Sequence, residues 1–330
     1  MYPRCAIEEG KMVRDEFEDC ARAGSRHARA ARRLIALVSA LGVLLVVASP
    51  GASDAAYPGA NGVIIYSQDC NLMTVNPDGS DNQLLLDLTD CVGASVWSPQ
   101  GKRFVFARGG DTFTTELWLA RSDGRGRRQL SDMRGGHSLG GWSPSGRKVI
   151  FSRVTRRTPE DIYVIEADGT GVKQLTSGSA RDTSPRWSPT ARRIAFISDR
   201  GGTDDIWMMN TRGNNLVRLT DDITRCDSGC TDTYGGINGM SWSPTGEQIT
   251  FAVNKGDGLS LLYVMDADGS NLTKVDGIGF EALYPAWSPD GSLIVYFNGE
   301  TLATIPPEGG RERRIQGTPE GFSPDWQPLP

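Results

Sequence analysis

The chain has 330 residues and a formal net charge of -5 at pH 7, with 38% hydrophobic and 23% charged residues. This length is enough for one large domain or two ordinary ones. The acidic balance, and the lack of a long basic run after residue 55, argue against nucleic acid and anionic membrane surfaces as partners. We therefore expect a folded protein that binds another class of ligand.

Residues 1–55 have the features of a presequence. Four arginines between residues 26 and 33 precede a 15-residue apolar run, residues 34–48. A membrane-spanning helix needs about 20 apolar residues, so this run suits the core of a signal peptide better. Candidate cleavage sites follow Ala48 and Ala55. We predict export to the periplasm, the cell envelope or the outside of the cell, with an uncleaved membrane anchor at 34–48 as the alternative.

A repeat organises residues 56–330. The motif Trp-Ser-Pro occurs five times, and a degenerate Trp-Gln-Pro follows near the C-terminus. The spacings between successive tryptophans are 45, 45, 55, 45 and 39 residues. Self-similarity at this period is typical of propeller blades. The repeated residues are Trp97, Trp142, Trp187, Trp242, Trp287 and Trp326.

Each complete copy predicts four short antiparallel strands. An aromatic residue lies nine positions after each of the first five tryptophans, in a segment where apolar residues alternate with others. A second apolar segment follows, such as residues 161–167, and then a tight turn that is Asp-Gly in most copies. Asp-Gly between alternating strands is a hairpin signal, because glycine accepts a positive φ at low cost. About 45 residues with four strands form one blade.

The two ends of the repeat region complement each other. The first copy, residues 62–89, lacks a tryptophan strand, and nothing follows the strand around Trp326. The C-terminal strand should therefore complete the first blade and close the ring. We predict an all-β, six-bladed β-propeller that occupies residues 56–330. Ala191 replaces the glycine of the Ser-Pro-x-Gly turn in one copy, so that turn should be slightly strained or should have a different shape.

The repeated motifs W-S-P-x-G, I-x-F, I-Y-V-x-x-x-D-G and Q-L-T resemble the WD-like repeats of the TolB propeller family. The segments "WSPDGSLIVYF" (287–297) and "ISDRGGTDDIWMMN" (197–210) carry the likeness best. It covers residues 61–330, the propeller portion of that family only. The resemblance implies the same propeller fold.

One stretch matches a catalytic motif. Gly136-His137-Ser138-Leu139-Gly140 fits G-x-S-x-G, the nucleophile elbow of serine hydrolases. An elbow needs a strand before the serine and a helix after it, whereas the repeat places this segment at the start of a strand. The other histidine of the chain, His27, belongs to the presequence, so no separate base serves the serine. We interpret the match as a coincidence.

Four cysteines follow the presequence, whereas Cys5 and Cys20 would be removed with it. An even number of cysteines in an oxidising compartment predicts disulfides. Two of them flank strands of the first blade, and the other two lie in the long 55-residue repeat. The predicted disulfide cysteines are Cys70, Cys91, Cys226 and Cys230.

The longest loops should lie on one face of the ring, where the chain approaches the central channel before each tryptophan strand. Rigid scaffolds often carry function on such loops. We predict a binding site for a peptide, a glycan or a cation at this mouth, with solvated rim residues as the alternative. The candidate residues are His137, Arg181, Asp182, Tyr234, Glu281 and Glu320.

A calcium site is a weaker hypothesis. Asp266-Ala267-Asp268-Gly269 starts like an EF-hand loop, but Asn271 stands where that loop requires glycine. A hairpin turn explains the segment better, because the turn recurs in other copies. We therefore predict no cofactor and no metal, and keep Ca²⁺ as an alternative.

No phosphate loop, metal-ligand cluster or set of histidines points to catalysis. We predict a monomeric, non-enzymatic propeller that binds an envelope protein or peptide, with a glycan as a further partner class. The alternative is a propeller enzyme of the glycosidase or lactonase type that uses carboxylates or Ca²⁺ at the channel mouth.

Overall fold

The computed structural model describes residues 57–88, 92–109, 114–133, 135–224, 236–254 and 259–330. All of them belong to one compact unit, Val47–Pro330. The predicted presequence lies outside the described residues, so its boundary at residue 55 stays a prediction. The described part of the chain consists of β-strands and turns, and it contains no helix that could span a membrane.

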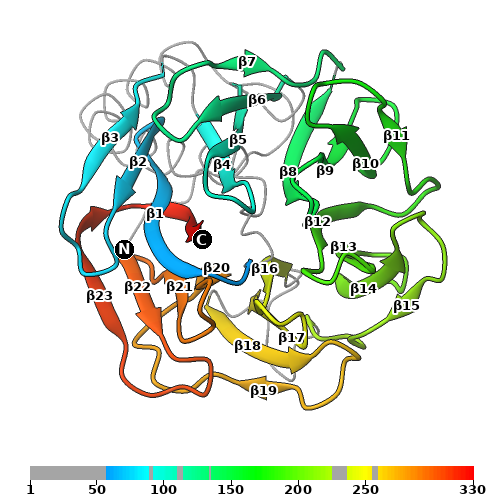
Figure 1. Cartoon of the computed structure of the whole chain (residues 1–330). Coiled ribbons are helices and arrows are strands. Elements are labelled where there is room, and N and C mark those ends of the chain that lie inside the picture. The colour runs from blue at the N-terminus through cyan, green and yellow to red at the C-terminus, as the bar shows by residue number, and fades with distance from the viewer. Residues whose placement is uncertain (1–56, 89–91, 110–113, 134, 225–235, 255–258) are drawn as a thin grey trace, which may run out of the picture. The chain divides into compact units, whose positions relative to one another are not determined.

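Six four-stranded antiparallel sheets are arranged as blades around a common centre, as predicted (Figure 1). The innermost strand of each blade ends at or just beyond a repeated tryptophan. The innermost strands are β4 (Val92–Trp97), β8 (Gly136–Trp142), β12 (Asp182–Trp187), β16 (Gly236–Trp242), β20 (Leu283–Trp287) and β24 (Phe322–Leu329).

The outer strands follow in sequence order within each blade. The second strands are β5 (Arg103–Arg108), β9 (Lys148–Val154), β13 (Arg193–Ser198), β17 (Gln248–Asn254), β21 (Ile294–Phe297) and, in the first blade, β1 (Ala60–Gln68). The third strands are β2 (Asn71–Val75), β6 (Glu116–Arg121), β10 (Asp161–Glu166), β14 (Asp205–Asn210), β18 (Ser260–Asp266) and β22 (Thr301–Ile305). The fourth strands are β3 (Gln83–Leu86), β7 (Arg128–Gln129), β11 (Lys173–Gln174), β15 (Val217–Arg218), β19 (Thr273–Lys274) and β23 (Arg313–Pro319).

The C-terminal strand closes the ring. Strand β24 pairs antiparallel with β1 in the first blade, where Trp326 lies opposite Ile64 and Asp325 opposite Ile65. The sheet order β24-β1-β2-β3 confirms that the last strand of the chain completes the first blade. We number the blades from this one, so that the fourth blade is β12–β15 and the fifth is β16–β19.

The hydrophobic core lies between blades. Six buried clusters each combine apolar side chains from two adjacent blades, and each cluster contains one of the six repeated tryptophans. Three indole N–H groups also donate to a backbone carbonyl of the preceding blade, at 3.2–3.3 Å: Trp142 to Val96, Trp242 to Arg186 and Trp326 to Ala286. The repeated tryptophan therefore joins neighbouring blades.

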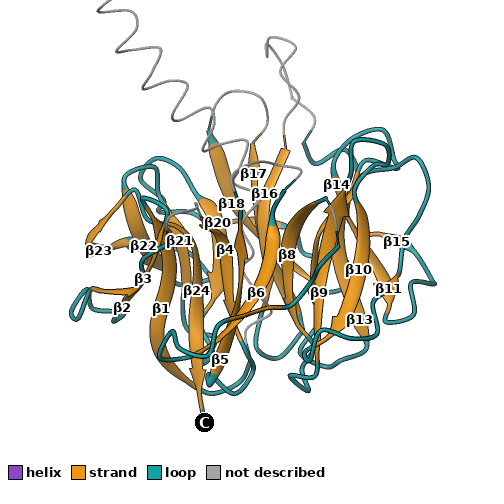
Figure 2. Ribbon diagram, turned by 90° about the horizontal axis from the view of Figure 1, so that it is seen from above, coloured by secondary structure: helices purple, strands orange, loops and turns teal. Residues whose placement is uncertain are grey.

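The strands run between two ends of the ring (Figure 2). The innermost strands begin at the end that also carries the connections between the second and third strands; we call it the loop-rich end. They finish at the opposite end, in the Ser-Pro-x-Gly turns. At the glycine position of these turns φ lies between 62° and 77° for the glycines, and Ala191 adopts φ 59°. Ala191 therefore keeps the turn and carries the strain of a left-handed conformation.

Candidate functional site

Asp182, at the start of β12, is held by side chains at the end of β13 and in the turn after it. It is 1% exposed. The Arg200 guanidinium donates to both of its carboxylate oxygens at 2.6 and 2.7 Å, and the Ser198 hydroxyl donates at 2.6 Å. Arg200 also lies over the rings of Phe196 and Trp207, with 5.2 Å to each centroid. Asp182 thus ties β12 to β13 at the loop-rich end.

Arg181 precedes Asp182 and presents a charge nearer to solvent. Its guanidinium donates to both oxygens of Asp204 at 2.7 and 2.6 Å, and its side chain is 42% exposed. Its backbone N–H donates to Asp199 at 2.8 Å. Two contacts to its own blade hold Arg181 in place, so the guanidinium is both oriented and accessible.

Asp161, at the start of β10, is a carboxyl group that the sequence reasoning missed. It is 6% exposed. Burial raises its pKa, and the nearby negative charge of Asp182 raises it further, while hydrogen bonds from Thr176 and Gln174 act in the opposite direction. One of its oxygens has no hydrogen-bond partner among the described residues. Asp161 is the first residue of a third strand, and Asp205 has the same position in the next blade. This recurrence is the sequence signal that could have identified Asp161.

Asp205 is the matching residue of the fourth blade, and its carboxylate is ion-paired and hydrogen-bonded. The Arg218 guanidinium donates to it at 2.6 Å, and the hydroxyls of Thr203 and Thr220 donate at 3.0 and 2.8 Å. Its side chain is 0% exposed. This carboxylate is therefore a structural anchor for the blade's outer strands.

His137 lies in β8 and is 2% exposed. Its Nδ1–H donates to the backbone carbonyl of Thr115, and its ring centroid is 5.5 Å from that of Phe151. Burial lowers its pKa, and the positive charge of Arg153 acts in the same direction. The histidine is therefore a neutral bridge between the second and third blades.

The segment Gly136–Gly140 lies within β8, as the repeat predicted, and all of its residues are buried. Ser138 is 7% exposed and faces its register partner Ser152 on β9. Strand continues on both sides of the serine through Trp142, so the strand–turn–helix geometry of a nucleophile elbow is not formed here.

Glu281 lies just before β20 in the sixth blade. Burial raises its pKa, against a hydrogen bond from the Ser260 backbone. Tyr284 follows it, with a pKa raised to about 12 by burial and by the Glu281 charge. Glu320 is exposed in the turn between β23 and β24, and its N–H donates to the Glu300 carbonyl at 3.0 Å. The structure thus distributes the candidates over several blades: Arg181 and Asp182 lie together in the fourth, His137 in the third and Glu281 in the sixth.

The innermost strands share an irregularity that sequence reasoning missed. In β8, β12, β16 and β20, the pairing with the second strand of the blade shifts register shortly before the tryptophan. Ser184, Tyr284 and Ser323 occupy the same repeat position, three residues before tryptophan, and adopt φ of 50°, 54° and 52°. Such bulges redirect side chains and often lie beside functional sites. Only the backbone geometry reveals them.

Tyr234, Cys91, Cys226 and Cys230 lie outside the described residues. Cys70 lies in the β1–β2 turn and is disulfide-bonded. Its pairing with Cys91, and the second disulfide, stay predictions.

The described residues contain no group of three or more His, Cys, Asp and Glu side chains that could hold a metal ion. Asp268 accepts hydrogen bonds from the backbone and hydroxyl of Ser270, at 2.9 and 2.6 Å, within the hairpin turn. The segment 266–269 therefore uses its aspartates to stabilise a turn.

A family model described as the TolB beta propeller domain matches residues 61–229. The chain belongs to this family. TolB from Acinetobacter baumannii has a similar structure, with a TM-score of 0.64 and 20% sequence identity over 81% of this chain and 67% of that one. A puromycin-hydrolyzing peptidase from Mycobacterium tuberculosis has a TM-score of 0.53 at 15% identity, over 80% of this chain and 45% of that one.

A curated relative is also similar in sequence. The uncharacterized peptidase YuxL from Bacillus subtilis is 32% identical over 93 residues. That match spans 28% of this chain and 12% of YuxL. The chain therefore covers only a small part of YuxL. The similar solved structures are all less than 25% identical in sequence, so they show the fold alone.

Proposed function

We propose that this TolB-family propeller is an exported, non-catalytic module that binds a protein or peptide of the cell envelope at its loop-rich end. The observation that carries the proposal is the accessible guanidinium of Arg181, fixed by Asp204 at 2.6 Å on a rigid blade. An oriented charge on a rigid element costs little entropy when a partner binds it. Membership of the TolB propeller family supports a binding role.

The chemistry of this end supports binding over catalysis. A general base must be able to reach the proton that it takes from a substrate. Asp182 and Asp205 are 1% and 0% exposed and form ion pairs with Arg200 and Arg218. His137 is buried and donates through Nδ1 to a backbone carbonyl. These three groups stabilise the blades, which leaves Arg181, Glu281 and Glu320 as the recognition groups.

The partner is a protein or peptide with acidic and basic groups, since Arg181 offers a cation and Glu281 and Glu320 offer carboxylates. A glycan is the second partner class. The arginine-flanked apolar run at residues 34–48 supports the assignment to the cell envelope. The protein acts as a monomer.

A hydrolase is the second candidate function, and one observation favours it. Asp161 has a raised pKa, and the charge of Asp182 contributes to that rise. Two neighbouring carboxyl groups with different environments are the arrangement of glycosidases. The likeness to proteins named as peptidases is a further reason to measure hydrolysis. Against this candidate, Asp161 is 6% exposed, so a substrate would have to reach a buried group.

The test is a cross-linked pull-down from the native cell envelope with the tagged full chain. An Arg181→Ala/Glu281→Ala variant is compared with wild type, and Lys173→Ala on the exposed outer strand β11 is the matched control. One protein retained by wild type and by the control, but lost with the double variant, supports the proposal. If all three proteins retain the partner equally, Arg181 and Glu281 do not form the binding site.

Hydrolysis is measured on the same preparations with glycoside and peptide substrates. Activity that Asp161→Asn abolishes, while partner capture stays unchanged, would favour the hydrolase.

A further inference from the structure

Phe280 is the most exposed large apolar side chain among the described residues, at 63%. It lies just before β20, at the loop-rich end of the sixth blade. The repeat does not require an aromatic residue seven positions before the tryptophan, where the other copies have Asp90, Gly135, Ala180, Gly235 and Pro319. Aromatic side chains are enriched in protein interfaces, so the exposed ring indicates a contact surface.

The backbone on both sides of Phe280 is fixed by hydrogen bonds. The Gly279 N–H donates to the Glu312 carboxylate at 3.2 Å. The Ala282 N–H donates to the Ser260 carbonyl of the fifth blade at 2.9 Å. A partner that binds the ring would therefore order little additional backbone, which lowers the entropic cost of binding.

A second exposed apolar side chain comes from the fifth blade. Leu259 is 37% exposed, and it directly precedes Ser260, which contacts Ala282 through the hydrogen bond described above. The chain therefore brings two exposed apolar residues, Leu259 and Phe280, to the same part of the loop-rich end.

The charged groups beside Phe280 are acidic. A Cβ added to Gly299 in the β21–β22 turn would lie 3.5 Å from Phe280 Cδ1 and 3.4 Å from Glu281 Oε2, so the ring and this carboxylate lie close together. Glu300 follows in the same turn, and its carbonyl accepts from the Glu320 N–H at 3.0 Å. No lysine or arginine occurs in the three segments that meet here, residues 279–282, 298–300 and 320–321.

Arg314 on β23 is a cation that contacts part of this acidic group. Its guanidinium lies 2.6 Å from Glu300 Oε2 and 3.5 Å from Glu312 Oε1. The Arg314 and Glu300 side chains are 50% and 68% exposed, so water screens their pair. Glu281 and Glu320 form no ion pair with another described residue. The surface around Phe280 therefore keeps an excess of negative charge, which attracts a basic partner.

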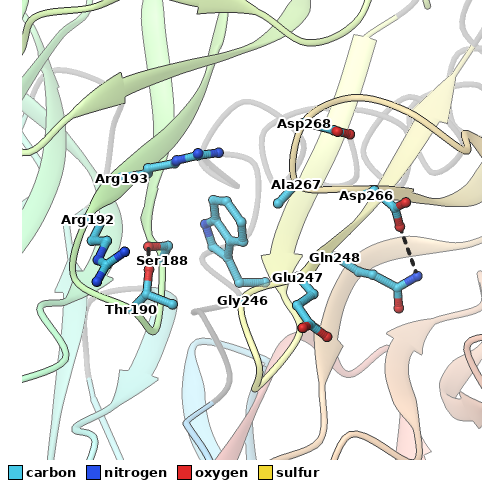
Figure 3. A pocket seen from close by; sticks show the side chains of 11 residues that line it. Ser188, Thr190, Arg192, Arg193, Gly246, Glu247, Gln248, Asp266, Ala267 and Asp268 are labelled. Carbon is cyan, nitrogen blue, oxygen red and sulfur yellow. Dashed lines mark hydrogen bonds between the residues drawn. The ribbon is translucent and has the colours of Figure 1, made fainter.

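The pocket between the fourth and fifth blades, at the opposite end of the ring, is different. It has a volume of about 740 Å³, and Figure 3 shows Arg192 and Arg193 on one side and Glu247 and Asp266 on the other. Trp242 in its lining is 1% exposed. This pocket offers neither an exposed apolar side chain nor charge of a single sign, whereas the surface at the loop-rich end offers both.

We propose that the surface formed by Leu259, Phe280 and Glu281 binds a peptide segment in which a lysine or arginine is next to an apolar side chain. The inference rests on the proposed function, and it names the partner chemistry at the sixth blade. The apolar side chain packs on Phe280, and the basic group pairs with Glu281. Glu300 and Glu320 add attraction that salt screens.

The test starts from a phage-displayed library of random short peptides, selected on the immobilised full chain. We expect the enriched peptides to carry lysine or arginine beside an apolar residue. A synthetic copy of an enriched peptide is then titrated against each variant by fluorescence anisotropy. Phe280→Ala should weaken its binding about tenfold or more, because the aromatic anchor is lost. Glu281→Gln should weaken it roughly threefold.

The matched control is Leu84→Ala, which removes a side chain that is 54% exposed on the outer strand β3 and should leave binding unchanged. Thermal unfolding of each variant verifies that it is folded. Equal affinity of wild type and Phe280→Ala overturns the inference, as does enrichment of peptides without basic residues, or of no peptide. Binding that is lost in Arg181→Ala and kept in Phe280→Ala overturns this inference alone and leaves the proposed function standing.

Discussion

The hydroxyl of Tyr57 donates to the backbone carbonyl of Trp142 at 2.5 Å, across 85 residues of sequence. Tyr57 precedes the first blade, yet it packs in the buried cluster between the second and third blades. Two residues later, the Gly59 N–H donates to the Pro289 carbonyl of the sixth blade, at 3.3 Å. The segment before β1 therefore connects blades that are not adjacent to each other.

Removing the Tyr57 hydroxyl should destabilise the propeller. We expect Tyr57→Phe to lower the free energy of unfolding by about 1 kcal/mol, because a buried hydrogen bond is lost. Tyr57→Ala should cost about 3 kcal/mol or more through the cavity that it leaves. Urea denaturation measures both. Tyr263→Phe is the control, since that ring stacks on Phe251 and its hydroxyl forms no hydrogen bond with another described residue; a loss as large as that of Tyr57→Phe would contradict the assignment.

Ala191→Gly should stabilise the protein. Ala191 has φ 59°, where a Cβ costs roughly 1–2 kcal/mol, and the greater freedom of glycine in the unfolded chain offsets part of the gain. We expect a net increase of about 0.5–1 kcal/mol in the free energy of unfolding. Gly246→Ala makes the opposite change at the same position of the next blade, where φ is 72° and the added Cβ would lie 3.2 Å from Thr190. Gly246→Ala should lower the free energy of unfolding. A change of the same sign in both variants would refute the strain argument.

Breaking the Asp182–Arg200 pair should be costly. Asp182 is 1% exposed and Arg200 20%, so Asp182→Asn leaves a largely buried guanidinium without its counter-ion. We expect a loss of about 3 kcal/mol, and a coupling energy of roughly 1–3 kcal/mol in a double-mutant cycle with Arg200→Met. Chemical denaturation of the four proteins measures it. The exposed pair Arg314–Glu300 is the control, because Glu300→Gln should change stability by less than about 1 kcal/mol.

Acidification should weaken the fold through His137. Burial lowers the folded-state pKa of this histidine below its ordinary 6.5, so the unfolded chain binds a proton that the folded chain does not. The stabilisation that comes from this pKa difference is fully present above about pH 6.5. It is lost as the pH falls below that value, by at most about 1.4 kcal/mol per pH unit. His137→Asn keeps a donor for the Thr115 carbonyl and removes the titration.

The check is the difference in unfolding free energy between wild type and His137→Asn, measured from above about pH 6.5 down to acidic pH. Asp161 and Glu281, whose pKa values are raised by burial, bind protons more readily in the folded state and act in the opposite direction. Both are present in the two proteins, so their effect cancels in the difference. Parallel pH curves for the two proteins would show that His137 titrates alike in the folded and unfolded states.

Residues 56–330 should contain two disulfides and no free thiol. Cys70 is disulfide-bonded, and Cys91 follows the last strand of the same blade. Peptide mapping under non-reducing conditions should recover Cys70–Cys91 and Cys226–Cys230. Labelling of two or more thiols without reductant would contradict this pairing.

The fold was readable from the sequence because the repeat is explicit. Trp-Ser-Pro at regular spacing marks the end of each innermost strand, and Asp-Gly marks the outer hairpins, since both depend on local backbone geometry. The incomplete first copy and the final strand around Trp326 predicted the closure that β24 and β1 form. The same repeat left open whether the turn at Ala191 would be strained or would change shape, and its φ of 59° shows that the turn is kept.

The sequence by itself determined the architecture, the register of the repeats and the strand character of the G-x-S-x-G segment. Only the tertiary structure decided which charges are accessible. Asp182 and His137 are buried in contacts with Arg200 and Thr115, whereas Arg181 remains exposed, because each outcome depends on partners from other strands. It also decided that the Arg103 guanidinium lies over the Trp142 ring, whereas that of Arg193 contacts the sulfur of Met208. Identical positions in a repeat receive different neighbours, and these neighbours set side-chain direction, desolvation and charge balance.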